Sequence, residues 1–239
     1  MLADFDIAVV LRAAPFLAEG LLLTFALTAL AILGGLLIGV FIAMGRTSGL
    51  APLSFLCAAY VNFFRSMPLI LVIFWFYFLV PIVAGRPVGG FYSVLIAFIL
   101  FEAAYYSEII RAGLQSVGVG QVAAGQALGL GYLQNMRFVV LPQAVRAMTP
   151  VLLTQAIILF QDTSLVYVVG LRDFLVSADI IANRDNRLME MFLTVALVYF
   201  ALCLAGTAAV ARLRRRLDRA GAVRPPTEDR SRSGEVPGG

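Results

Sequence analysis

The sequence predicts an all-α integral membrane protein with five transmembrane helices. Of the 239 residues, 61% are hydrophobic and 13% are charged, a balance outside the range of soluble globular proteins. A helix needs roughly 20 apolar residues to cross about 30 Å of hydrocarbon, and the chain has room for several such runs. Because these runs are far longer than the strands of a transmembrane barrel, the predicted spans are helical.

The residue types in the chain restrict its chemistry. All 18 basic residues are arginines and there is no histidine, which excludes histidine metal ligands, histidine-based triads and lysine Schiff bases. We therefore expect no metal site, no cofactor and no catalytic site. The pI near 9.4 does not indicate nucleic-acid binding, because the excess arginines lie beside the spans and in the carboxy-terminal tail. Cys57 and Cys203 lie in apolar stretches, which favours packed thiols over a disulfide.

The first span is predicted at residues 16–44. Residues 1–15 lack a basic region and a small-residue cleavage site, so we expect an exposed amino-terminal segment and not a signal peptide. Within the span, Gly34, Gly35 and Gly39 place small residues near one another, as is typical of helix contacts in membranes.

The next apolar run is interrupted by Arg65 and Pro68. This interruption predicts an interfacial helix at 53–65, followed by the second span at 68–83. Four glycine and proline residues in 84–90 then predict a tight turn before the third span.

The third span is predicted at 91–110 and the fourth between Pro150 and Gly170. Thr149 is a typical N-cap, Pro150 suits the first helical position, and Gly170 suits the end of the helix. These two spans are joined by a long loop at about 112–147.

The remaining chain predicts a surface helix, a fifth span and a tail. Apolar residues recur at helical spacing within 171–190, including Phe174 and Ile181, which favours a short amphipathic helix. The fifth span is predicted at 191–210. Residues 216–239 are rich in Pro, Gly and Arg and are expected to be disordered.

The arginines predict the orientation. Five spans place the termini on opposite sides of the membrane. Thirteen arginines fall in the segments 46–65 and 111–146 and in the tail, whereas five fall on the other side. By the positive-inside rule, the amino terminus is outside, and the carboxy terminus and the loop at 112–147 are cytoplasmic.

Polar residues inside the fourth span are candidates for a solute path. Ionisable groups within spans are costly and usually face the interior of the bundle or a water-filled path. Gln155 and Asp162 share one helix face, while Thr154 and Gln161 share a neighbouring one. This stripe either fastens the bundle through hydrogen bonds or lines a solute path. We favour the solute path, because an unpaired carboxylate inside the membrane is an energetically unfavourable way to hold helices together.

Other ionisable residues have open or structural roles. Glu102 shares a helix face with two tyrosines and is a further candidate for the path. Glu108 and Arg111 are three residues apart on the predicted third span, which favours an ion pair at the membrane edge. Arg65 either extends to the interface or contributes to the inner gate of the path.

The predicted cytoplasmic loop contains a compact helical stretch flanked by glycines. Its small residues and low charge could form a knob that seats in a groove of another protein, although a loop that skirts the membrane is the alternative. The residues assigned to this knob are Gly120, Gln121, Ala123, Ala124, Gly125, Ala127, Leu128 and Gly129.

Three motifs together resemble the permease subunits of ABC importers for polar amino acids. GQVAAGQALGL followed by LPQAVRAMTP resembles the coupling loop of that family, FRSMPLIL resembles its Phe-Arg-Gly-x-Pro-Leu stretch, and DTSL resembles its Asp/Lys-x-Thr-Ser-Leu element. The resemblance covers about residues 15–215. It is strongest to the glutamate/aspartate branch, through FEAAYYSEIIRAG and LLTQAIILFQDTSLVYV.

The resemblance implies a type I ABC importer fold in the bacterial inner membrane, with a cytoplasmic coupling helix. It also implies two ATP-binding subunits that hydrolyse ATP, a second homologous permease subunit or a second copy of this chain, and a periplasmic amino-acid-binding protein. The glutamate of the family's loop aligns with Ala123, so docking on the ATPase is expected to rest on shape. We hypothesise that the partner permease supplies that glutamate.

The resemblance implies an amino acid as the solute, with glutamate or aspartate favoured over glutamine, histidine or arginine. An acidic amino acid needs cationic donors for its carboxylates and an acceptor for its ammonium. We expect Asp162 to accept from the ammonium and Arg65 or Arg111 to bind a carboxylate. Further hydrogen bonds are assigned to Gln161, Thr163 and Ser164.

Two further expectations concern the partners and the rival function. The outer segment 171–187, with its mixed charges, is the expected docking surface for the binding protein. An ion-coupled secondary carrier is the alternative function. Such carriers commonly show paired internal repeats, and the five predicted spans show no evident duplication.

Overall fold

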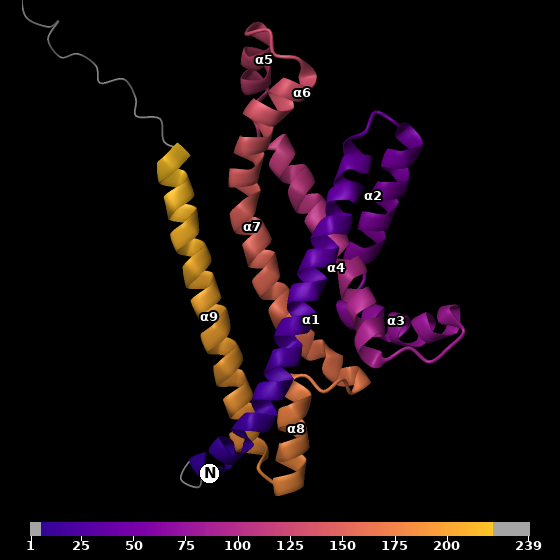
Figure 1. The fold of residues 1–239 in the computed structure, drawn as a ribbon, viewed down its shortest axis with the longest axis vertical. Helices are drawn as coiled ribbons and strands as arrows, with labels where there is room; N and C mark the ends of the chain where they lie inside the picture. The colour runs from indigo at the N-terminus through magenta and orange to yellow at the C-terminus, as the bar shows by residue number, and fades with distance from the viewer. Residues whose placement is uncertain (1–5, 222–239) are drawn as a thin grey trace, which may run out of the picture.

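The computed structural model describes residues 6–221, which are helical apart from short connections (Figure 1). This confirms the all-α prediction. The helices are α1 (Ile7–Thr47), α2 (Ala51–Arg65), α3 (Leu69–Ala84), α4 (Gly90–Gln115), α5 (Val119–Ala127), α6 (Tyr132–Asn135), α7 (Leu141–Asp162), α8 (Phe174–Asp185) and α9 (Leu188–Gly221), with a π-helical segment at Met136–Val140 and a 3-10 segment at Thr163–Val169.

Helix α1 begins at Ile7, earlier than the predicted start at residue 16. The cause is a cap at the amino-terminal end: a carboxylate oxygen of Asp6 accepts a hydrogen bond from the backbone N–H of Ala8 at 2.9 Å. The helix has 41 residues and is therefore roughly 60 Å long, about twice the hydrocarbon thickness. Part of α1 must therefore tilt or extend beyond the bilayer.

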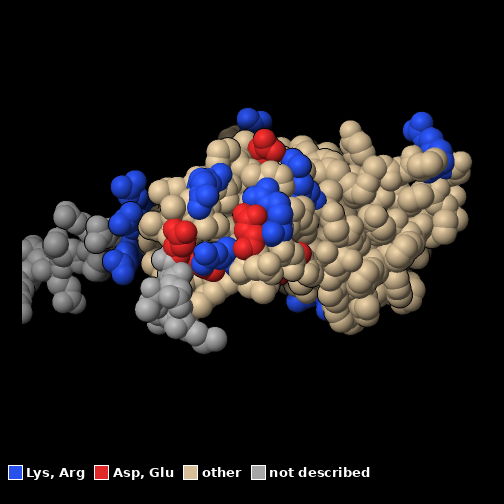
Figure 2. Space-filling view, turned by 90° about the horizontal axis from the view of Figure 1, so that it is seen from below, with Lys and Arg blue, Asp and Glu red and all other residues tan. Residues whose placement is uncertain are grey.

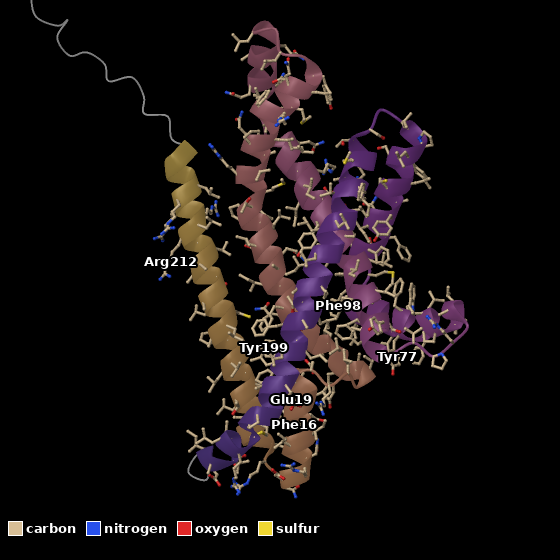
Figure 3. All side chains as sticks on the ribbon, viewed as in Figure 1. Phe16, Glu19, Tyr77, Phe98, Tyr199 and Arg212 are labelled. Carbon is tan, nitrogen blue, oxygen red and sulfur yellow. The ribbon has the colours of Figure 1, made fainter. Side chains whose placement is uncertain are left out.

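Helix α4 lies at the centre of the bundle and packs against α1, α2, α3 and α7. The contact with α1 is close because α1 presents glycines to it, as the sequence predicted. A Cβ atom at Gly39 would lie 2.9 Å from Cβ of Tyr106 and 3.1 Å from the carbonyl oxygen of Ala103. Phe98 is fully buried at this centre (Figure 3).

The segment α2–α3 corrects the prediction of an interfacial helix followed by a full span. α2 runs back alongside α1 and α3 turns away from it (Figure 1), with an angle of 107° between them. α3 has 16 residues, or roughly 24 Å, which is short of the hydrocarbon thickness. Within residues 6–221, four helices are long and apolar enough to cross a membrane. The total reaches five only if α2 and α3 together form one broken span.

The start of the fourth span is also corrected. Thr149 and Pro150 do not begin a helix, because α7 already begins at Leu141 and follows directly on the preceding π-helical segment. Thr149 donates its hydroxyl to the carbonyl oxygen of Val145 instead of acting as a cap. Pro150 lies inside α7, so the segment LPQAVRAMTP is helical.

The end of the fourth span and the surface helix are confirmed. Gly170 ends the 3-10 segment with φ +66°, a left-handed conformation that suits glycine. α8 follows, and its apolar face, including Phe174, Ala178 and Ile181, packs against α1 and α9 in a second core. Cys57 and Cys203 are both free thiols, as predicted.

The fifth span is longer than predicted. α9 continues to Gly221, so the part of the expected tail at 216–221 is helical. The remainder of that expected tail, 222–239, lies outside the described residues.

The bundle has two ends, which we call the α5 end and the α8 end (Figure 1). The α1–α2 connection, α5, α6 and the last turns of α9 gather at the α5 end, whereas α8 and the first turn of α1 lie at the α8 end. Arg65 departs from its prediction, which counted it with the cytoplasmic segment 46–65 at the end of an interfacial helix. Because α2 is roughly 22 Å long, Arg65 lies at the α2–α3 bend, well away from the α5 end.

Candidate functional site

Three elements bring polar side chains together near the middle of the bundle. Arg65 comes from the end of α2, Glu102 and Tyr105 from α4, and Gln155 and Asp162 from α7. We call these five residues the central polar cluster. They include four of the eight residues that the sequence assigned to the solute path, together with Tyr105, which had been recognised as a neighbour of Glu102.

Glu102 is the buried member of the central polar cluster. Its side chain is 0% exposed, and both of its carboxylate oxygens accept from the side-chain amide of Gln155, at 3.2 and 3.3 Å. A carboxylate that is buried without donors is unstable, so this amide stabilises the acid and links α4 to α7.

Arg65 and Asp162 provide opposite charges near Tyr105. The guanidinium carbon of Arg65 lies 5.5 Å from the centre of the Tyr105 ring, a cation–π contact. Asp162 is half-buried and lies within electrostatic range of both Glu102 and Tyr105. Such an arrangement offers a cationic donor, carboxylate acceptors and an aromatic wall within one region.

The polar residues around Asp162 do not all face this cluster. Gln161 and Ser164 line a separate hollow of about 440 Å³ beside α9, which also contains Tyr199 (Figure 3). Ser164 donates to the carbonyl oxygen of Gln161 at 2.8 Å, and the buried Thr163 donates to that of Phe160 at 2.6 Å. The structure therefore divides the predicted set between two sides of α7.

Arg111 lies in a different group from Arg65. Glu108 accepts from both Arg111 and Arg46, so one carboxylate joins α4 to the end of α1. Arg111 also donates to Gln115. The predicted pair of Glu108 and Arg111 is confirmed, and Arg46 is an additional partner that the sequence spacing could not indicate. Of the two arginines assigned to a solute carboxylate, only Arg65 joins the central polar cluster.

The predicted knob is formed by α5, α6 and the turn between them. Asn135 is buried and donates its side-chain amide to the carbonyl oxygen of Val122 at 2.9 Å, which ties α5 to the base of α7. A Cβ atom at Gly125 would run into the Asn135 side chain and displace it, so the glycine leaves room for this contact. Gly129 has φ +79° and permits the sharp turn after α5.

The outer surface of the knob is apolar and exposed. Ala123 and Ala124 are exposed, and the large apolar residues are Val119, Leu128, Tyr132, Leu133 and Phe138, with exposed fractions between 64% and 83%. An exposed apolar surface at the end of the bundle is typical of a protein–protein contact. The sequence identified the knob from its glycines, but Asn135, which fixes its position, gave no recognisable signal.

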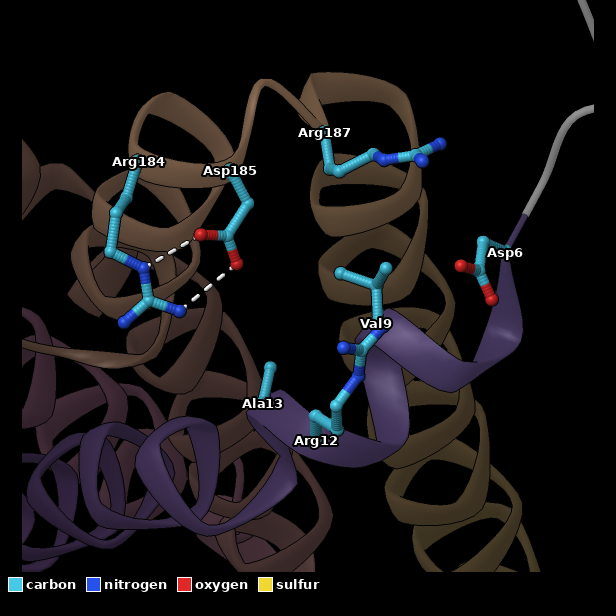
Figure 4. Close-up of a pocket in the computed structure, with 7 residues that line it drawn as sticks. All are labelled: Asp6, Val9, Arg12, Ala13, Arg184, Asp185 and Arg187. Atoms are coloured by element: carbon cyan, nitrogen blue, oxygen red, sulfur yellow. Dashed lines mark hydrogen bonds and ion pairs between the residues drawn. The ribbon is translucent and has the colours of Figure 1, made fainter.

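The α8 end carries mixed charges (Figure 2). A cleft of about 410 Å³ lies between the first turns of α1 and the α8–α9 junction, and Arg12, Arg184 and Arg187 line it with Asp6 and Asp185 (Figure 4). Arg184 donates to both oxygens of Asp185, at 2.7 and 2.9 Å. Such interleaved charges suit a reversible contact with another charged surface.

Asp173 begins α8 and is fully buried. One of its carboxylate oxygens accepts from the backbone N–H of Val176 at 2.8 Å, so this residue is the N-cap of α8. Burial raises the pKa of Asp173 to about 6, although backbone N–H groups oppose this increase. Nearby, Thr24 of α1 accepts from the N–H of Phe174 at 3.1 Å, which fixes α8 against α1.

Residues 35–219 match the family described as binding-protein-dependent transport system inner membrane component. The chain therefore belongs to this family of membrane-embedded transport subunits, and the predicted family is confirmed. The family description agrees with the apolar helices of the bundle and with the predicted inner-membrane location.

Among relatives, the chain is 46% identical over 220 residues to the glutamate/aspartate import permease protein GltK of Escherichia coli O6:H1, covering 89% of this chain and 98% of the relative. It is 34% identical over 201 residues to the probable glutamine ABC transporter permease protein GlnM of Bacillus subtilis, covering 84% and 93%. A solved amino acid ABC transporter with histidines superposes with a TM-score of 0.83 and 31% identity, covering 88% of this chain and 98% of that chain.

Proposed function

We propose that this chain is the membrane-spanning subunit of an ATP-driven importer of acidic amino acids, with glutamate and aspartate as its solutes. The observation that carries the proposal is the 46% identity to GltK along nearly the whole chain. In this proposal the chain itself hydrolyses nothing. It works with two ATP-binding subunits, a second permease subunit or a second copy of itself, and an amino-acid-binding protein.

The central polar cluster has the chemistry that an acidic amino acid requires. Arg65 can donate to a solute carboxylate, and Asp162 can accept from the solute ammonium. Gln155 is already engaged by Glu102, so it positions the acid and the helix α7. Gln161, Thr163 and Ser164 remain proposed hydrogen-bonding partners. The structure assigns Arg111 to the ion pair with Glu108, so Arg65 is the preferred ligand for a carboxylate.

The proposed orientation places the α5 end in the cytoplasm and the α8 end outside. The apolar surface of the knob then faces the ATP-binding subunits, and the mixed charges of the α8 end face the binding protein. Because Asn135 ties α5 to the helix that continues into α7, closure of the ATP-binding subunits would move α7, which carries Gln155 and Asp162 of the central polar cluster. Alternating access follows from this rigid movement.

Uptake of labelled glutamate by the complete importer in proteoliposomes tests the proposal. Asp162→Ala is expected to abolish uptake, and Arg65→Gln to reduce it by at least about tenfold, while both variants still assemble with the ATP-binding subunits. Arg86→Gln, which removes an arginine from the α3–α4 loop, is the matched control and should leave uptake unchanged. Normal uptake by Asp162→Ala would refute the assignment of the site.

Competition distinguishes the proposed solutes from the alternative. Excess unlabelled aspartate is expected to block glutamate uptake, whereas glutamine, histidine and arginine are not. Glutamine is the second candidate, because GlnM is 34% identical to this chain. Stronger competition by glutamine than by aspartate would replace the proposed solute and leave the proposed transport function intact.

A further inference from the structure

Residues of α7 and α9 line two hollows, and Val210 of α9 belongs to the lining of both. We call them together the α7–α9 groove. The hollow nearer the α5 end has a volume of about 570 Å³, and its lining includes Arg146, Pro150, Val151, Thr207, Arg214 and Leu217. The other hollow has a volume of about 450 Å³ and is almost wholly apolar, with Phe25, Leu153, Ile157, Phe160, Gly206 and Leu213 in its lining.

The two arginines of the α7–α9 groove line the same hollow from facing helices, Arg146 from α7 and Arg214 from α9. This hollow is the one nearer the α5 end, so the positive charge lies at one end of the groove.

Among the residues that the structure describes, the charged ones that line this groove are both arginines. The sequence has no Asp or Glu between Glu108 and Asp162, and none between Glu190 and Asp218, which follows Arg214 by one helical turn. Exposed arginines elsewhere on the last turns of α9 increase the positive potential; these are Arg212, Arg215 and Arg216.

The apolar part of the groove extends away from the arginines into the membrane. From Leu213 to Cys203, both of which line it, α9 covers roughly 15 Å, which is half of the hydrocarbon thickness. An occupant must therefore be anionic beside the two arginines and apolar where it fills the second hollow. A basic pocket between transmembrane helices is a recurring site for anionic lipid headgroups.

We propose that the α7–α9 groove binds an anionic phospholipid of the surrounding membrane. The phosphate lies between Arg146 and Arg214, where two guanidinium groups can donate to its oxygens, and an acyl chain extends past Val210 into the apolar hollow. A zwitterionic lipid offers the same chain but a net neutral headgroup, so the two arginines select for net negative charge. The proposal does not depend on the solute that the protein transports.

Photolabelling of the complete importer tests this site. The complex is reconstituted in liposomes that contain phosphatidylglycerol with a diazirine in its acyl chain, and the cross-linked peptides are identified by mass spectrometry. Label is expected on residues 153–160 of α7 and 202–213 of α9. Labelling there should fall roughly 5-fold in Arg146→Gln or Arg214→Gln and roughly 30-fold in the double variant, as expected for two separate charge contacts.

The matched control is Arg212→Gln/Arg215→Gln, which removes the same number of positive charges, both of them from α9. Within residues 6–221, these two arginines are not among the residues that line the groove, and Arg212 lies on the side of α9 away from α7 (Figure 3). This control is expected to label as the wild type does. Arg146→Lys/Arg214→Lys retains both charges and is expected to keep most of the labelling, which separates loss of charge from misfolding.

Three results would overturn the proposal. The first is equal labelling by a phosphatidylcholine probe with the same acyl chain, which would indicate an apolar surface without selection for charge. The second is equal loss of labelling in the Arg146→Gln/Arg214→Gln variant and its matched control. The third is the absence of label in the groove of the wild-type complex, as expected if a helix of the second permease subunit occupies it.

Discussion

Along α1, Gly34, Gly35 and Gly39 allow α4 to approach until side chains of Glu102 and Tyr106 lie directly on the α1 backbone. Along α7 and α9, by contrast, hollows of about 450 and 570 Å³ remain between the helices. The difference indicates that the two helix contacts have different roles. The α1–α4 contact is a close-packed support that fixes the buried acid, whereas the α7–α9 contact is open, so it can admit lipid or a partner and can change shape during transport.

The largest expected effect is a substitution that separates α1 from α4. Gly39→Leu places side-chain atoms against the Tyr106 Cβ and the α4 backbone, and it is expected to destabilise the protein by about 3 kcal/mol or more and to prevent assembly. Gly206→Leu on α9 is the matched control. There the nearest atoms, at 3.2 and 3.3 Å, belong to the flexible side chain of Ile157, so the cost is about 1 kcal/mol or less.

The yield and thermal unfolding of the purified complex measure both variants. Equal losses in Gly39→Leu and Gly206→Leu would contradict the difference between the two contacts.

The next effect concerns the place where α1, α8 and α9 meet. The pKa of Asp173 is raised from 3.8 to about 6 in the folded protein, so the native state retains a proton that the unfolded chain has already lost. The contribution of Asp173 to the free energy of unfolding is therefore largest below about pH 4. It falls by about 2 to 3 kcal/mol as the pH rises through about 6.

Asp173→Asn keeps an oxygen that can cap α8 and removes the titration, so this part of the pH dependence is expected to disappear. Thermal unfolding midpoints between pH 4 and pH 7 provide the measurement, with Asp179→Asn on the same helix as the control. An unchanged slope in Asp173→Asn would show that another group causes the pH dependence.

A smaller effect separates the two sides of α7. Gln155→Leu removes the amide donor from the buried Glu102 and is expected to cost about 1 to 3 kcal/mol, because the carboxylate loses its partner. Gln161→Leu changes the same residue type on the exposed side toward α9 and should leave stability nearly unchanged. If Gln161→Leu proved the more destabilising of the two, the assignment of the α7 faces would be wrong.

The smallest effect requires no change to the protein. Cys203 borders the hollows between α7 and α9, whereas a Cβ atom added at Gly45 would lie only 2.6 Å from the Cys57 sulfur, so that thiol packs closely against α1. A membrane-permeant maleimide is therefore expected to label Cys203 faster than Cys57, as followed by mass spectrometry of the peptides. Faster labelling of Cys57 would indicate that the open contact is elsewhere.

The elements that the sequence predicted well are those with local signals. The glycines of α1, the glycine that ends the 3-10 segment and the glycine-flanked knob each mark a backbone requirement that one residue satisfies. Glu108 and Arg111 are three residues apart on one helix, so their pairing follows from helical geometry alone.

The elements that the sequence predicted poorly depend on tertiary contacts. Thr149 and Pro150 form a typical helix start, yet the preceding π-helical segment extends α7 past them, so the local preference is overridden. Likewise, Arg65 was expected on the cytoplasmic side, at the end of an interfacial helix. It lies instead at the α2–α3 bend, because Val61 and Phe64 pack α2 along the bundle. Only the fold reveals that Arg65 shares a region with Asp162.

The central claim is that an ATP-hydrolysing partner, docked on the knob at the α5 end, drives glutamate transport through this chain. Glutamate uptake into proteoliposomes tests it most directly, with the permease subunits alone or together with the ATP-binding subunits and ATP. We predict uptake only when the ATP-binding subunits and ATP are present, and its loss in Leu128→Asp, which places a charge on the apolar surface of the knob. Uptake by the permease subunits alone under an ion gradient would contradict the account.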